Sequence, residues 1–340
     1  MSASSRAEGA TAARAVAAAL AVSIAVVGCG DLPTPPASTA AAARTAPDDS
    51  DAWNLVPATA SSLADLNLAA LRGSPWSRTL VTGGFVEDRD ERLRAFGYDV
   101  FNDADRVVVA GFDDGGRASQ TVVVAGRFDA ARVGRAFIAA TPGAAEARWR
   151  DCSLWEGHGR AVALVGATLV QGTPETVRAA IDAAWGIVPD ARGGALGALA
   201  RDVDAEAHRP AVTLAFLVTD DMRARAAGFT EIPTDLRRVA ARLDLGADLE
   251  LQGQAVFDDA AGAGPAARFW DGSLRELKQN RMLRIMGLGP VVDGATLEAD
   301  GPRVFLHLRI GEDRREALSE RLLLLLQTIA RQRGPSAPQP

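Results

Sequence analysis

The chain has 340 residues, of which 48% are hydrophobic, and its formal net charge is −6. That length and composition are sufficient for one large core or two ordinary ones. Acidic and basic residues are interspersed without a basic block, which argues against nucleic-acid binding, and only two cysteines argue against a disulfide framework.

The N-terminus carries a short apolar run behind two basic residues. Arg6 and Arg14 precede Ala15 to Val27, which contains no charged residue. The run is too short to cross a bilayer core, which needs roughly 20 apolar residues. Its length is typical of the apolar region of a signal peptide.

The run ends in Val26-Val27-Gly28-Cys29, which resembles the lipobox of bacterial lipoproteins. The resemblance implies cleavage between Gly28 and Cys29 and acylation of Cys29, with palmitate among the attached chains. More than one acyl chain holds a protein on a membrane almost permanently. Gly30 after the cysteine favours the outer membrane, while Asp31 leaves the inner membrane open. The competing interpretation is a chance apolar run that ends in Gly-Cys.

Composition divides the remaining chain into segments. Residues 1–28 are the expected signal peptide, and residues 29–52 are rich in proline, alanine and aspartate, which predicts a disordered tether. Two α+β halves follow, at 53–209 and 210–333, and 334–340 form a tail. Cys152 has no expected intramolecular partner if Cys29 is acylated.

In the first half, hydrophobic periodicity and capping residues predict strands and helices in alternation. The expected strands are Ala58–Leu68, Asp105–Phe112, Gln120–Phe128, Arg148–Trp155, Arg160–Val165 and Thr168–Gln171. The expected helices begin at Ser74-Pro75, near Glu87, at Asp129, at Thr173-Pro174 and near Gly194.

The order of elements then starts again after Pro210. The expected elements are a strand at Ala211–Val218, a helix from Asp220, a hairpin of Arg237–Leu245 and Asp248–Phe257, a helix over Pro265–Met286, a hairpin of Gly294–Ala299 and Arg303–Ile310, and a C-terminal helix over Leu318–Ile329.

The two halves also share a local pattern. Asp103 to Asp129 and Asp235 to Asp258 each contain an Arg-Val strand, an acidic-glycine turn and a second strand that ends in Phe-Asp. This indicates a diverged internal repeat, although hairpin–helix units can look alike by chance. Hairpins outnumber crossovers, so the predicted fold is α+β: two similar halves, each an antiparallel sheet with helices packed on one face.

Catalytic and metal-binding motifs are not found in the sequence. His158, His208 and His307 lie far apart without a second ligand at metal-site spacing, and no HExxH, CxxC, GxSxG or phosphate loop occurs. Cys152 lies near His158, but a small cysteine in a strand usually packs inward and is inert. No cofactor and no metal is indicated.

Two aromatic residues provide a possible ligand-contact face. In the strand predicted at Arg148–Trp155, Trp149 and Trp155 would lie on one side, with Asp151 and Ser153 between them on the same side. Such a strip could stack on a sugar or grip a peptide, although it is more often the edge of a core.

The sequence therefore predicts a lipid-anchored cell-envelope protein with a non-catalytic binding or structural body. Its expected partners are the membrane, through the lipid, and an envelope protein or cell-wall component; no oligomeric state is indicated. The alternatives are a hydrolase of an envelope polymer, with a site that no motif reveals, and a two-lobed solute receptor, which the hairpin-rich order disfavours. The body resembles uncharacterised bacterial envelope lipoproteins in Val56-Pro57-Ala58 and in the strand-turn-helix from Thr168 to Asp182, a resemblance that implies no function.

Overall fold

The computed structural model describes residues 46–77, 97–113, 118–203, 210–226, 233–285 and 289–315. Its strands are β1 Ser62–Asn67, β2 Ala104–Asp113, β3 Ala118–Gly126, β4 Ala145–Trp149, β5 Cys152–Gly157, β6 Arg160–Val165, β7 Thr168–Gly172, β8 Val212–Leu217, β9 Leu236–Leu245, β10 Leu249–Phe257, β11 Ala295–Asp300 and β12 Arg303–Ile310. Its helices are η1 Ala52–Leu55, α2 Leu68–Gly73, α5 Val100–Asp103, α6 Ala130–Ala140, α7 Pro174–Ala184, α8 Ala195–Val203, α9 Asp220–Ala226, α10 Ala260–Gln279, α11 Arg281–Ile285, α12 Gly289–Asp293 and η2 Glu312–Arg314.

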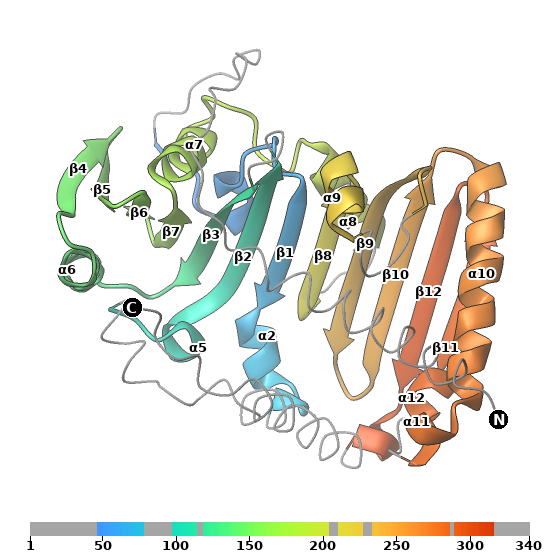
Figure 1. Cartoon of the computed structure of the whole chain (residues 1–340). Coiled ribbons are helices and arrows are strands. Elements are labelled where there is room, and N and C mark those ends of the chain that lie inside the picture. Colours follow the sequence, from blue (N-terminus) through green and yellow to red (C-terminus); the bar gives the residue numbers. More distant parts are fainter. Residues whose placement is uncertain are drawn as a thin grey trace, which may run out of the picture.

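All these strands belong to one antiparallel sheet (Figure 1). Their order across the sheet is β11-β12-β10-β9-β8-β1-β2-β3-β7-β6-β5-β4. The predicted α+β class is confirmed. The two halves do not form separate sheets, however, because β1 of the first half pairs directly with β8 of the second.

The two halves have the same strand order outward from the centre of the sheet. Outward from the centre the first half runs β1-β2-β3-β7-β6 and the second runs β8-β9-β10-β12-β11, and the first half adds the β4–β5 hairpin at its edge. Both long hairpins shift register at the second residue of their first strand, Asp105 in β2 and Arg237 in β9. Asp103 and Asp235 also use equivalent carbonyls, which accept the N–H groups of Arg127 and Asp258.

Helices cover both faces of this sheet. On one side, here called the η1 face, η1, α7 and α8 bury Leu55, Ile181 and Leu199 against β1, β2, β3, β6 and β7. On the other side, here called the α10 face, α2, α6, α10 and α12 pack over three smaller clusters. The expectation of helices on a single face is therefore wrong.

The reason lies in strands that are apolar on both sides. In β3 the neighbours Val123 and Val124 point to opposite faces and are both fully buried, and so are Leu169 and Val170 in β7. Strands that bury both faces appear as continuous hydrophobic runs and need a layer on each side. Here α7 covers the η1 face of these strands and α6 covers the other.

Several local predictions are confirmed. Asp129 caps α6, and its carboxylate accepts the Arg132 N–H at 2.9 Å. Thr173 and Thr176 form a capping box at the start of α7, which ends before Gly186 in the left-handed region at φ +68°.

Three boundaries differ from the expectation. The strand predicted at Arg148–Trp155 is two strands, β4 and β5, joined by a turn at Arg150-Asp151. Helix α10 begins at Ala260 with Asp259 as its cap, so Pro265 lies inside the helix instead of at its start. Ser74 follows the end of α2. The predicted elements near Glu87 and over Leu318–Ile329 lie outside the described residues.

The end of the predicted tether is bound to the body. The Asp48 N–H donates to the Ala184 carbonyl at the end of α7, and Asp49 accepts the Ala167 N–H in the β6–β7 turn at 2.8 Å. Asp51 is buried. The folded body thus begins near Asp48 and not at Trp53, because Asp48 donates a hydrogen bond to the body and Asp49 and Asp51 accept hydrogen bonds from it.

Candidate functional site

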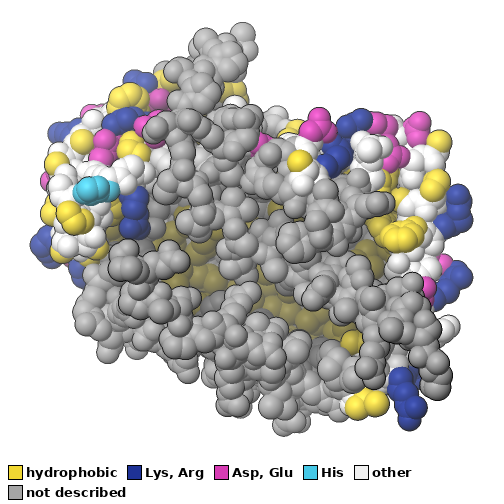
Figure 2. Space-filling model, viewed as in Figure 1, with side chains coloured by type: hydrophobic (Ala, Val, Ile, Leu, Met, Phe, Trp, Pro, Cys, Tyr) yellow, Lys and Arg dark blue, Asp and Glu magenta, His cyan; other side chains and the backbone are white. Residues whose placement is uncertain are grey.

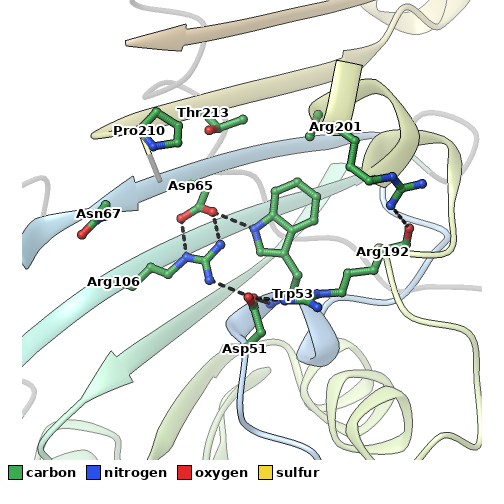
Figure 3. Close-up of a pocket in the computed structure, with 11 residues that line it drawn as sticks. Asp51, Trp53, Asp65, Asn67, Arg106, Arg192, Arg201, Pro210 and Thr213 are labelled. Carbon is green, nitrogen blue, oxygen red and sulfur yellow. Dashed lines mark hydrogen bonds and ion pairs between the residues drawn. The ribbon is translucent and has the colours of Figure 1, made fainter. Parts of the chain in front are cut away.

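A polar cavity lies on the η1 face, where the two halves meet. Its volume is about 240 Å³, and η1, α8 and the central strands β1, β2 and β8 surround it (Figure 3). The described residues that line it are Asp51, Trp53, Asp65, Asn67, Arg106, Arg192, Gly197, Ala200, Arg201, Pro210 and Thr213. Three arginines and two aspartates thus converge in one small space.

Arg106 is the central group of this cavity. Its Nε donates to Asp65 Oδ1 at 2.8 Å, its Nη2 also bonds Asp65, and its Nη1 donates to Asp51 Oδ1 at 2.8 Å. The Arg106 side chain is only 15% exposed. Burial opposes its charge most strongly, but the hydrogen bonds and negative charges of Asp65 and Asp51 outweigh that effect, so the pKa of Arg106 is raised above its ordinary value.

Asp51 connects the start of the folded chain to the sheet. Its Oδ1 accepts the Trp53 N–H at 2.9 Å and caps η1. The same carboxylate pairs with Arg106 from β2 and with Arg192 from the segment before α8. One buried carboxylate therefore joins three parts of the chain that are distant in sequence.

Asp65 is the second buried carboxylate. The Trp53 indole Nε1 donates to its Oδ2 at 2.7 Å, which adds a third hydrogen bond to the bidentate contact from Arg106. Trp53 is 7% exposed and belongs to the core cluster of the η1 face. Asp65 is thus held by a charged and a neutral donor in fixed positions.

This arrangement occurs in one half only. Arg238 of β9 occupies the position that corresponds to Arg106, because both follow the register shift at the start of their hairpins. Arg106 pairs with Asn67, two residues after Asp65, and Arg238 pairs with Leu217, two residues after Ala215, so Ala215 occupies the position that corresponds to Asp65. The second half therefore lacks the acceptor, and the cluster is not a duplicated feature.

Arg201 and Thr213 also line the cavity. The Arg201 Nη1 donates to the Arg192 carbonyl at 2.7 Å, and its other N–H groups lie in an exposed side chain. Thr213 is 3% exposed and pairs with Asp65 across β1 and β8. No histidine, serine or cysteine is among the described lining residues, and no group of three potential metal ligands occurs in the described part of the chain.

The two tryptophans singled out in the sequence do not share a face. Because the Arg150-Asp151 turn separates β4 from β5, Trp149 lies in one strand and Trp155 in the next. Trp149 packs against the core cluster of the η1 face, whereas Trp155 belongs to the cluster under α6. The expected joint ligand-contact face is wrong.

Trp149 is half-buried beside α7. Its Nε1 donates to Asp182 at 3.1 Å, and the guanidinium carbons of Arg178 and Arg150 lie 5.4 and 5.8 Å from its ring centroid. Arg150 also donates to Asp182, at 2.9 Å. Trp155 is 5% exposed, and a Cβ built on Gly134 of α6 would lie 2.4 Å from its ring. Trp155 is a core residue.

The structure also places most of the cysteine and histidine residues considered above as catalytic or metal-binding candidates. Cys152 is buried as a free thiol, and burial raises its pKa, as predicted for an inert cysteine. His158 lies in the β5–β6 turn with φ +50°, and His307 lies in β12. His208 and the expected lipid-attachment residue Cys29, with Gly28 before it, lie outside the described residues.

The Asp51–Asp65–Arg106 cluster is not predicted by the sequence patterns. Because Asp65 and Asn67 alternate with Ala64 and Leu66, the pattern predicts a polar side of the strand at Asp65, but Asp65 shares the buried face with Leu63. One sequence feature could have indicated a buried charge: Asp65 lies inside a predicted strand between the apolar residues Ala64 and Leu66. The partner could not be found in the sequence, because Arg106 is 41 residues away.

Comparisons with known proteins give little guidance. Neither a protein-family model nor a curated protein matches this chain. The chain is similar to crystal form I of TP0453, with a TM-score of 0.48 and 11% identity over 80% of this chain and 97% of that chain. Crystal form III gives 0.48 and 11% over 79% and 98%, and crystal form IV gives 0.47 and 10% over 79% and 96%.

Proposed function

We propose that this chain is a lipid-anchored cell-envelope protein whose folded body is a non-catalytic binding or structural module. The observation that carries the proposal is the uncharged run Ala15 to Val27 followed by Gly28 and Cys29. Acylation of Cys29 would attach the protein to the outer or inner membrane and leave the body in the periplasm or at the cell surface. Among the described residues, no helix is long and apolar enough to cross a membrane.

The cavity chemistry supports a body that does not catalyse. A hydrolase of an envelope polymer would need a carboxylate or another side chain free to exchange a proton with the substrate. The two cavity carboxylates, Asp51 and Asp65, are both hydrogen-bonded to Arg106, and Asp51 also pairs with Arg192. Such fixed ion pairs stabilise a conformation, so we favour binding or structure over hydrolysis.

The anchored position also agrees with the way the body begins. The segment from Asp48 to Asp51 is fixed to α7, to the β6–β7 turn and to Arg106, so a chain from Cys29 would reach the body at one defined place. About 20 residues separate Cys29 from Asp48, and a disordered tether of that length, as the composition predicts, would have an average reach of roughly 25 Å. A partner would therefore be met close to the membrane surface.

Fractionation of cells that express the full chain tests the anchor. Cys29→Ala should move the protein from the membrane fraction to the soluble fraction and abolish labelling by a palmitate analogue. Cys152→Ala is the matched control, since it removes the other cysteine, and it should leave both results unchanged. If Cys29→Ala remains with membranes to the same extent as the unmodified chain, the proposal fails.

A pull-down from detergent-solubilised envelopes tests the binding role. The full chain should recover an envelope protein or cell-wall fragment that is absent from a control with an unrelated lipoprotein. Recovery of the protein alone would argue against a binding role and leave a structural one.

A further inference from the structure

Among the described strands, β4 lies at one edge of the sheet. It pairs with β5 and is the last strand in the order on its side (Figure 1). An edge strand presents unpaired backbone N–H and C=O groups, which can pair with another strand. Figure 2 shows basic and acidic side chains intermixed at this end of the molecule, where a single sign of charge would repel a second copy.

The residue pairs with β5 show which backbone groups point outward. Trp149 and Cys152 flank the two-residue turn, and the pair that flanks such a turn exchanges backbone hydrogen bonds. Hydrogen-bonded and non-hydrogen-bonded pairs alternate along an antiparallel ladder. Arg148 and Glu146 therefore direct their N–H and C=O groups away from β5, toward the open side.

The side chains of β4 are complementary to the same sequence read in the opposite direction. Ala147 is at the centre, Glu146 and Arg148 carry opposite charges on either side of it, and the small Ala145 stands at the opposite end from the large Trp149. In an antiparallel pair centred on Ala147, each Glu146 would face an Arg148, and each Trp149 would lie beside an Ala145. Both charged side chains are exposed.

We propose that β4 pairs with β4 of a second copy of this chain, antiparallel and about a two-fold axis at Ala147. The outward groups of Glu146 and Arg148 would form the hydrogen-bonded pairs, and Ala147 would face its own copy in a non-hydrogen-bonded pair. The interaction is isologous, so it closes as a dimer. The two sheets would become one continuous sheet.

The opposite edge of the sheet lacks this charge complementarity. In β11, Asp300 and Arg303 flank a two-residue turn, so Glu298 is one of the residues that could centre a non-hydrogen-bonded self-pair, as Ala147 does in β4. Two Glu298 side chains would then face each other, with Asp300 adding negative charge nearby. Like charges that face each other across strands are destabilising. A self-pair centred on Glu298 is therefore less favourable than the one centred on Ala147.

Disulfide trapping in membranes that contain the full chain tests the axis. In a non-hydrogen-bonded pair the two Ala147 Cα atoms would be about 4.5 Å apart, within the range of roughly 4.4–6.8 Å that a disulfide spans. Ala147→Cys should therefore give a covalent dimer under mild oxidation. Ala145→Cys is the matched control, because its two copies would be about 13 Å apart and should not crosslink. The unmodified chain should also stay monomeric on a denaturing gel.

Charge reversal tests the pairing independently of the cysteine. In the Ala147→Cys background, Glu146→Arg or Arg148→Glu alone would place like charges opposite each other and should reduce the crosslinked fraction severalfold. The double variant Glu146→Arg/Arg148→Glu restores opposite charges and should recover the crosslink. The proposal is overturned if Ala147→Cys and Ala145→Cys crosslink equally, if neither does, or if the double reversal behaves like the single ones.

Discussion

Replacing Arg106 with methionine should destabilise the body strongly, and the loss should depend on pH. Methionine keeps much of the aliphatic volume but removes the charge between Asp51 and Asp65, which are 6% and 8% exposed. Removing one partner of a buried ion pair typically costs roughly 3–5 kcal/mol. Because Asp51 keeps Arg192 and Asp65 keeps the Trp53 indole, we expect about 3 kcal/mol. For a body of this size that corresponds to a fall of roughly 6–10 °C in Tm.

The pH dependence identifies the cause of this loss. Without Arg106, the two buried carboxylates lose the cation that offsets the cost of burying their charge, and protonation of a carboxylate at low pH removes that cost. The difference between the variant and the unmodified protein should therefore be largest near pH 7 and smaller near pH 4.

Urea unfolding followed by tryptophan fluorescence measures both effects. Arg268→Met is the control, since Arg268 is exposed on α10 and its loss should change stability by at most about 0.5 kcal/mol. Combining Asp65→Asn with Arg106→Met should cost less than the sum of the two single changes, because the variants share one interaction. A loss below about 1 kcal/mol, or one that stays the same at pH 4, would refute a buried ion pair as the stabilising feature.

Two further predictions follow from buried side chains. Gly134→Ala should destabilise the protein by about 1–2 kcal/mol, because its Cβ would lie 2.4 Å from the Trp155 ring. The control Gly272→Ala adds a Cβ with no neighbouring group within 4 Å and should stabilise α10 by up to about 1 kcal/mol. Equal shifts in Tm for the two variants would contradict the packing of α6 against Trp155. Tyr98 is the only tyrosine, and burial raises its pKa to about 12, so tyrosinate absorbance should rise near pH 10 in urea but only near pH 12 in the folded protein. The raised pKa of Tyr98 therefore favours the folded state below pH 10, and this contribution is lost as the pH rises toward 12. The Tyr98→Phe variant supplies the background spectrum. A midpoint of tyrosinate formation near pH 10 in the folded protein would show that the ring is exposed.

Hairpins and caps could be predicted from the sequence because their determinants are local. The hairpin loop at 246–248 and the cap Asp129 depend on residues within a few positions of each other. The pattern that the two halves share is local as well, since each half carries its own Phe-Asp before a helix. Short-range chemistry of this kind does not require knowledge of the sheet.

The position of the cavity could not be predicted, because it depends on strand pairing across the whole chain. Asp65 and Arg106 meet only because β1 pairs with β2, and Thr213 joins them only because β1 also pairs with β8. The strand predicted at Arg148–Trp155 failed for another reason. The turn at Arg150-Asp151 contains no glycine, and Arg150 adopts φ +56°, a conformation that sequence rules reserve mainly for glycine or asparagine.

The pairing of β1 with β8 also has a consequence for the order of folding. Leu63 and Ala215 face each other although about 150 residues lie between them, so closing this contact carries the entropy of a very long loop. The hairpins on either side close over a few residues and form much faster. We therefore expect each half to fold first around its own hairpins and the seam between β1 and β8 to form last. Until then both strands present unpaired edges, so the junction of the halves is the place where a newly made chain is most exposed to misassembly.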